Sequence, residues 1–138
     1  EVRRLLNPAA FKLGSGKMAE DIAVPRGRVA EAVRRAREIT DRYGLKLLLF
    51  GHLGDGNLHV DIMFDAADQA QHDRAAKARD EVFDTALDLG GTVSGEHGIG
   101  LSKREAATRQ IGAAERGLMA EVRRVFDPLG IMNPGKDW

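Results

Sequence analysis

The chain has 138 residues, enough for one domain with a hydrophobic core. Its 21 Lys and Arg residues balance its 21 Asp and Glu residues, and a net charge of zero argues against a nucleic-acid or anionic-membrane surface as its main role. It has no cysteine, which excludes disulfides and thiolate metal sites. No signal or transmembrane segment is visible, because the longest apolar run is far short of the roughly 18–20 residues of a membrane span.

The first 18 residues are predicted to be a lead-in or linker remnant. Asn7-Pro8 and the glycines around Ser15 interrupt any long periodicity there. The motifs crowd toward the C-terminus, and the chain begins at Glu1 rather than Met. We therefore expect residues 19–138 to be one domain of a longer protein.

Two helices and three strands are predicted in the first two thirds of the chain. Residues 20–24 form a β-prone run, and Pro25 can open the helix that follows it, whose apolar residues recur at helical spacing as far as Tyr43. Residues 45–64 indicate a β-hairpin with Asp-Gly at its turn. A second helix is expected at about 67–89, before a pair of glycines.

A short strand at 92–94 and a helical region at 102–126, broken near Ile111-Gly112, complete the chain. The order β-α-β-β-α-β followed by a C-terminal helix predicts an α+β fold. It is the ferredoxin-like, split βαβ arrangement, an antiparallel sheet with helices on one face. The last helical region carries an apolar stripe made of Ala114, Leu118, Val122, Val125 and Leu129.

The predicted hairpin carries two of the four histidines, His52 and His59, in a frame of three glycines. Side chains alternate along a strand, so His59 and Asp61 should share one face, and the hairpin should bring His52 back across from His59. The glycine spacing recurs around Glu96-His97. In an ideal split βαβ sheet, however, the last strand lies at the edge opposite the hairpin, which would place Glu96 far from His52.

His52, His59 and Glu96 offer two imidazole nitrogens and one carboxylate oxygen. Three protein ligands leave a coordination position open, which is typical of a catalytic metal site. Zinc is the first candidate, with manganese or iron(II) as the others. Asp61 could be a fourth ligand or could orient His59, and His97 could act as a base near neutral pH. The alternative is that these loops only turn the chain.

Three segments resemble, in order, the signatures of a known family. They are residues 51–59, 94–100 and 126–136, and they are similar to the C-terminal domain of FAD-linked oxidases among the vanillyl-alcohol-oxidase-like flavoproteins. The most similar branch contains D-lactate dehydrogenase, glycolate oxidase and D-2-hydroxyglutarate dehydrogenase. Residues 20–25 also resemble the strand-to-helix entry of that branch.

The resemblance implies an FAD-dependent enzyme that oxidises a D-2-hydroxy acid to the 2-oxo acid by hydride transfer to flavin. FAD would be bound mainly by an N-terminal domain that these residues do not contain, so the isolated domain is expected to be inactive. The expected partners are the hydroxy acid, that FAD domain and an electron acceptor, which could be a carrier protein, a quinone or a cytochrome. The expected location is the cytoplasm or the periphery of the inner membrane.

The resemblance also implies roles for single residues. His52, His59 and Glu96 would bind the divalent metal beside the flavin, and His97 would remove the hydroxyl proton. The implied cofactor-binding residues are Glu96, His97 and Asn133. Asp61 stands at a position that is often Asn in this branch, near metal and substrate. The family's substrate-binding lysine would fall close to Ala19, which is not a lysine here, and since Lys17 lies two residues away the role is not carried over to it.

Two other functions compete with this one. The ether-lipid synthase branch of the family is disfavoured, because its multi-histidine segment differs from residues 51–59. A free-standing ferredoxin-like metal-binding or regulatory module would keep the metal and have no redox activity. In the isolated domain, exposed apolar surface left where the FAD domain would pack could drive the formation of a homodimer.

Overall fold

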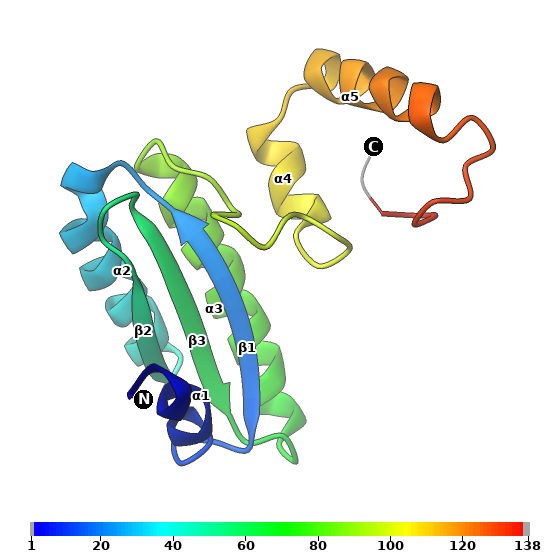
Figure 1. The fold of residues 1–138 in the computed structure, drawn as a ribbon. Coiled ribbons are helices and arrows are strands. Elements are labelled where there is room, and N and C mark those ends of the chain that lie inside the picture. The colour runs from blue at the N-terminus through cyan, green and yellow to red at the C-terminus, as the bar shows by residue number, and fades with distance from the viewer. Residues whose placement is uncertain (1, 137–138) are drawn as a thin grey trace.

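Three antiparallel strands form the sheet, in the order β1-β3-β2 (Figure 1). In the computed structural model, which describes residues 2–136, the strands are β1 (Gly16–Ala23), β2 (Lys46–His52) and β3 (Asn57–Phe64). The central strand β3 alternates apolar and polar residues, so one of its faces is apolar. Leu58, Val60 and Ile62 on that face are at most 2% exposed, which makes this face the centre of the core.

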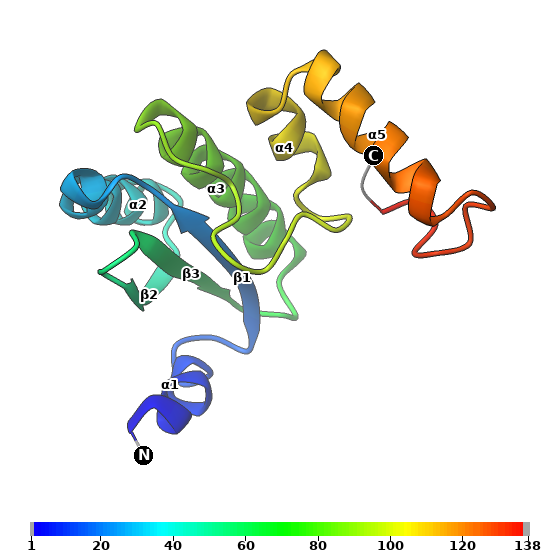
Figure 2. The same cartoon turned by 45° about the horizontal axis from the view of Figure 1, so that its top comes forward.

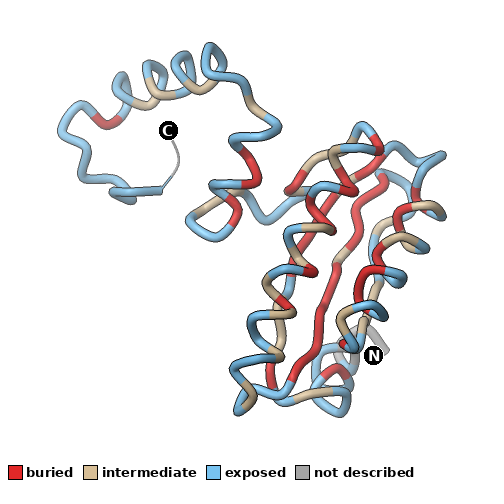
Figure 3. The backbone as a smooth tube through the Cα atoms, turned by 180° about the vertical axis from the view of Figure 1, so that it is seen from behind, coloured by how far each residue is buried: buried red, intermediate tan, exposed pale blue. Residues whose placement is uncertain are grey.

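Two long helices cover the apolar face of the sheet. They are α2 (Val29–Arg42), which follows a short 3-10 turn η1 (Arg26–Arg28), and α3 (Gln69–Asp88). The side chain of Asp68 caps α3 by accepting a hydrogen bond from the backbone N–H of Gln71 at 3.1 Å. Figure 2 shows these two helices on one side of the sheet and α1 (Val2–Ala10) on the other, and Figure 3 shows buried residues along the sheet and the inner sides of the helices.

The predicted α+β class and the antiparallel sheet are confirmed, but the expected fourth strand is reduced to one bridge. Thr92 pairs with Ala23 through N–H···O bonds of 2.8 and 3.1 Å, at the edge beside β1 that the split βαβ arrangement predicts. The next backbone N–H groups are taken by side chains. Gln110 accepts from Val93, and the Thr92 hydroxyl accepts from Ser94. The ladder therefore stops after a single residue.

The residues predicted as a lead-in adopt regular structure. The helix α1 fills part of them, and β1 begins at Gly16 rather than at Glu20. Gly16, Lys17 and Met18 pair in register with the end of β3, and a Cβ at position 16 would clash with the ring of Phe64. A glycine that breaks a sequence pattern thus permits close packing at this strand end.

The C-terminal arm, residues 104–136, lies apart from the sheet (Figures 1 and 3). It contains α4 (Arg104–Gln110) and α5 (Ala113–Phe126), divided at the predicted break. No residue of α5 is buried, and its apolar residues are largely exposed, for example 63% for Leu118 and 76% for Val125. The stripe exists as predicted but packs against nothing in the described part of the chain. None of the helices within residues 2–136 has the length and apolar character needed to cross a membrane.

Candidate functional site

The hairpin places its two histidines on the face of the sheet that α2 and α3 leave open. In the ladder, Phe50 pairs with His59 and His52 pairs with Asn57, so the two histidines are diagonal neighbours on one face. Their ring centroids are 5.4 Å apart. At the turn, Gly56 has a φ of +80° and leaves no room for a Cβ beside the carbonyl of Val24. The predicted faces of the hairpin are therefore confirmed.

Glu96 reaches both histidines, although the bridge at Thr92 lies at the edge of the sheet opposite β2. Its Oε1 is 3.2 Å from His59 Nε2 and 3.8 Å from His52 Nε2. The chain does not continue along the sheet edge after Thr92 but turns back over β1 toward the hairpin (Figure 2). One donor atom from each of the three residues lies within 4.8 Å of the others.

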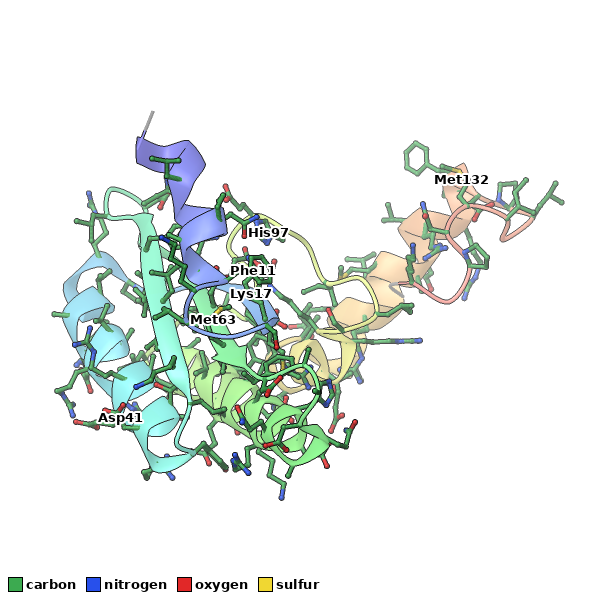
Figure 4. The ribbon with its side chains drawn as sticks, turned by 90° about the horizontal axis from the view of Figure 1, so that it is seen from below. Phe11, Lys17, Asp41, Met63, His97 and Met132 are labelled. Atoms are coloured by element: carbon green, nitrogen blue, oxygen red, sulfur yellow. The ribbon has the colours of Figure 1, made fainter. Side chains whose placement is uncertain are left out.

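His97 lies beside this cluster. Its ring centroid is 5.4 Å from that of His59, and its Nδ1 is 3.5 Å from Asp21 Oδ1. About half of the His97 side chain is exposed. Figure 4 shows His97 and Lys17 on the side of the sheet where α1 lies.

Two charged residues, Asp21 and Lys103, support the site although the sequence analysis did not assign them to it. Asp21 is fully buried, and Lys103, 4% exposed, donates from its Nζ to an Asp21 carboxylate oxygen and to the Asp21 carbonyl. Burial alone would raise the pKa of Asp21, but hydrogen bonds from Lys103 and from the amides of Glu96 and His97 outweigh it and lower the pKa from 3.8 to about 2. The sequence feature that could have identified Asp21 is its position as a carboxylate inside the β-prone run of residues 20–24.

The neighbouring carboxylate of Glu20 shows the opposite behaviour. Its Oε2 is 3.7 Å from Lys103 Nζ, and burial raises its pKa above the ordinary value despite the nearby Lys103 and Arg79 charges. Lys103 therefore serves mainly as the counter-ion of Asp21.

A cavity of about 380 Å³ opens beside the cluster, between α1, β1 and β3. Lys17 lies in its wall, where its Nζ donates to Asn7 Oδ1 at 2.7 Å and to Asp61 Oδ2 at 3.3 Å. Asp61 shares a face with His59 as predicted, yet its polar contact is to Lys17 on the neighbouring strand rather than to a histidine. The cavity is lined by Asn7, Lys17, Ala19, Glu20, Phe50, His59, Asp61, Glu96 and His97.

Asn133 does not join these residues. It lies in the turns after α5 with a φ of +47°, and its carbonyl accepts from Arg123 Nη2 at 3.1 Å. Figure 4 places its neighbour Met132 at the far end of the arm from His97. Within the described residues, the structure thus brings together five of the six predicted site residues, with Asp61 reaching the cluster only across the cavity.

The donor set of His52, His59 and Glu96 fits a single divalent cation. Nitrogen and oxygen ligands of zinc lie about 2.0–2.2 Å from the ion, so two ligands at a tetrahedral angle are roughly 3.4 Å apart. The two carboxylate–imidazole separations of 3.2 and 3.8 Å bracket that value, and all three donor atoms lie within 4.8 Å of one another. A neutral imidazole pair with one carboxylate also suits manganese and iron(II).

Comparison with known proteins identifies the family. Residues 1–136 match the family described as "FAD linked oxidases, C-terminal domain". Glycolate oxidase subunit GlcD of Bacillus subtilis is 35% identical over 136 residues, which are 99% of this chain and 29% of that protein. The mitochondrial D-lactate dehydrogenase [cytochrome] of Arabidopsis thaliana is 34% identical over 127 residues, 92% of this chain and 22% of that protein.

A third relative, D-2-hydroxyglutarate dehydrogenase of Stutzerimonas stutzeri, is 38% identical over 120 residues, 84% of this chain and 26% of that protein. The chain therefore spans between 22% and 29% of the length of these relatives. The family match covers both histidine loops and the whole arm. The chain belongs to the FAD linked oxidases, as a C-terminal domain of that family.

Proposed function

We propose that this chain forms the metal- and substrate-binding part of an FAD-dependent enzyme that oxidises a D-2-hydroxy acid to the 2-oxo acid. The observation that carries the proposal is the convergence of His52, His59 and Glu96 on one point, with His97 beside them on an open face of the sheet. The relatives are named for glycolate, D-lactate and D-2-hydroxyglutarate, which are all 2-hydroxy acids.

His52, His59 and Glu96 hold the divalent cation in this proposal, with zinc as the first candidate and manganese or iron as the others. When bound, the cation would lower the pKa of a coordinated substrate hydroxyl, and the flavin would accept the hydride from the α-carbon. The protein's own contribution is to fix three donors and to leave the remaining positions open to the substrate's carboxylate and hydroxyl.

His97 takes the hydroxyl proton. Its Nδ1 faces Asp21 Oδ1 at 3.5 Å, and its Nε2 lies 3.8 Å from Glu96 Oε1, so Nε2 is the ring atom on the side of the cation site that would accept a proton from the substrate. A neutral imidazole is the species required, and histidine is the side chain whose ordinary pKa permits it near neutral pH.

Lys17 binds the carboxylate of the substrate. Of the residues that line the cavity in the described part of the chain, it alone carries a permanent positive charge. An ammonium group has three N–H donors, and the contacts to Asn7 and Asp61 use two of them. Because Lys17 and Ala19 are two residues apart on one strand, they share a face, and Lys17 can serve the role expected of a lysine at position 19.

The exposed apolar side of the arm contacts the FAD-binding part of the longer protein. Val125, Phe126, Leu129 and Ile131 are each at least 72% exposed, and large apolar side chains exposed in one short segment are typical of an interface. The relatives are several times longer than this chain, so they contain the additional residues that could cover it. A second copy of the chain is the competing occupant.

The test uses the full-length protein with FAD bound. Under anaerobic conditions, flavin absorbance is followed after addition of D-lactate, glycolate or D-2-hydroxyglutarate, and the electrons are then offered to a quinone, a cytochrome or a carrier protein. We expect one of these acids to bleach the flavin, and His97→Gln to slow the bleaching by at least about 100-fold.

His72→Gln is the matched control, because His72 is an exposed histidine on α3 outside the site. It should leave the rate unchanged. If no hydroxy acid reduces the flavin while the chain still binds metal, the free-standing metal-binding or regulatory module is the better account. If His97→Gln reduces flavin at the normal rate, His97 is not the base.

A further inference from the structure

The loop that carries Glu96 and His97 has almost no regular structure to hold it. The last ladder residue is Thr92, and the next helix, α4, begins at Arg104. A metal site needs its donors held in position, since mobile donors lose conformational entropy when they bind. A group outside the loop must therefore fix it.

Asp21 supplies that fixed point. Its Oδ2 accepts hydrogen bonds from three successive backbone N–H groups, those of Gly95 at 2.7 Å, Glu96 at 2.5 Å and His97 at 3.1 Å. The carboxylate is fully buried, and hydrogen bonds to a charged acceptor are stronger than neutral ones. The three bonds set the backbone direction of the loop at the two residues that carry the chemistry.

Lys103 holds Asp21 in turn. It donates to the other carboxylate oxygen and to the Asp21 carbonyl, from the segment just before α4. The two ends of the loop are thereby tied to the same residue of β1. On the opposite side of the loop, Gly95 lies against the side chain of Asn57, where a Cβ would clash. The inner side of the loop is thus held by β1, the hairpin and Lys103, while residues 95–98 are exposed on the outer side.

We infer that the buried Asp21–Lys103 pair is a positioning device for the loop, which sets Glu96 against the hairpin histidines although neither member is one of the three proposed ligands. Asp21 also faces His97 Nδ1 at 3.5 Å, so the same carboxylate orients both functional side chains of the loop. The inference deepens the proposed function, because it concerns how Glu96 is delivered to the proposed cation site. Glu96 should contribute to cation binding only while Asp21 holds the loop.

The first measurement is amide hydrogen exchange on this chain without metal, so it does not depend on the cation site. We expect Asp21→Asn, which keeps one oxygen acceptor, to accelerate exchange at positions 95–97, and Asp21→Ala to accelerate it further, by at least about tenfold. The amides of Val60 and Ile62 in β3 report global unfolding and serve as the internal reference.

A second pair of variants guards against misfolding. Removing the Asp21 charge alone leaves Lys103 buried without its partner, which by itself destabilises a protein. Asp21→Ala combined with Lys103→Met removes both charges. If this double variant folds and its loop amides still exchange fast relative to those of β3, the faster exchange is caused by the loss of the Asp21 carboxylate as hydrogen-bond acceptor.

The second measurement is the affinity for zinc, with and without Glu96→Gln, in the wild-type and Asp21→Asn backgrounds. The inference predicts that Glu96→Gln weakens binding strongly in the wild type and at most about twofold when Asp21 is already changed, because coupled residues are not additive. A role of Asp21 in stability alone would not produce this coupling.

Two results would overturn the inference. One is unchanged exchange at positions 95–97 relative to β3 in the Asp21 variants, and the other is an equal loss from Glu96→Gln in both backgrounds. If the wild type binds no zinc, the proposed cation site fails, and the exchange experiment alone decides whether Asp21 fixes the loop.

Discussion

The hairpin and the loop between Thr92 and Arg104 bring candidate site residues to one place by different physical means. The hairpin positions His52 and His59 through a continuous ladder, in which each residue is fixed by its direct neighbours across the strands. The loop positions Glu96 and His97 through a single buried carboxylate, to which its amides are bonded across 74 to 76 residues of sequence. Half of the site thus rests on local pattern and half on one long-range contact.

The two halves of the candidate site should respond differently to substitution. Removing one side chain from a ladder leaves the backbone pairing intact, so the register survives. Removing Asp21 deletes all three amide contacts at once, and removing Lys103 deletes the cation that pairs with the Asp21 carboxylate. We therefore expect substitutions of Asp21 or Lys103 to affect both stability and site geometry. Substitutions in the hairpin should be able to change one without the other.

The largest effect is expected from Lys103→Met. This change leaves the Asp21 carboxylate buried without its cation, and breaking a buried ion pair costs about 3–5 kcal/mol of unfolding free energy. Urea unfolding of the metal-free chain measures it. Adding Asp21→Asn should recover part of the loss. A loss below about 1 kcal/mol for the single variant would show that Lys103 does not form a buried ion pair with Asp21.

Val60→Ala should lower stability by roughly 2 kcal/mol, because Val60 is fully buried and its loss leaves a cavity. Val60 lies on the face of β3 opposite His59, so the zinc affinity of the folded chain should not change. Urea unfolding and zinc titration of the same sample separate the two quantities. A parallel loss of affinity would mean that the hairpin site depends on core packing as strongly as the loop does.

Acid should weaken the loop support in a defined pH range. The pKa of Asp21 is about 2 in the folded chain against 3.8 ordinarily, so its stabilisation is complete above pH 4 and is lost as the pH falls toward 2. The shift corresponds to about 2 kcal/mol. In EDTA, wild type should lose that much more stability between pH 5 and pH 2 than the variant with Asp21→Asn and Lys103→Met, and equal losses would refute the assignment.

The smallest effect on stability is expected in the arm. Val125→Asp and Phe126→Asp should change the unfolding free energy by no more than about 0.5 kcal/mol, because both side chains are exposed. Light scattering of the isolated chain should show less self-association than in wild type. Glu121→Gln, an exposed polar change on the same helix, is the control and should leave association as it was. A monomeric wild type at high concentration would count against a homodimer.

The hairpin half of the candidate site could be predicted from the sequence because its geometry follows from patterns within a few neighbouring residues. Alternation along residues 57–64 and the Asp-Gly turn suffice to put His52, His59 and Asp61 on one face. The α+β class and the break between α4 and α5 follow from similarly local patterns.

The position of Glu96 could not be derived in the same way. An ideal fourth strand would have carried it to the wrong edge, and the chain turns back because Asp21 binds its amides. Lys103 looks like an ordinary surface residue in the sequence, since nothing nearby reveals that it is buried. In the arm, the apolar stripe was visible, but a stripe does not say whether its partner lies in the same chain.

Direct titration of this chain with zinc and with manganese decides whether the claim that His52, His59 and Glu96 form one cation site is correct. Calorimetry is run on wild type, His59→Ala and Glu96→Ala, with His72→Ala as the matched control for an exposed histidine. Changes to the partners of metal ligands already cost 10–100-fold in affinity, so loss of a ligand should cost at least about 100-fold. We predict one ion per wild-type chain, the same in His72→Ala, and none at comparable concentration in the two ligand variants. Equal binding by all four proteins, or no binding by the wild type, would contradict the claim.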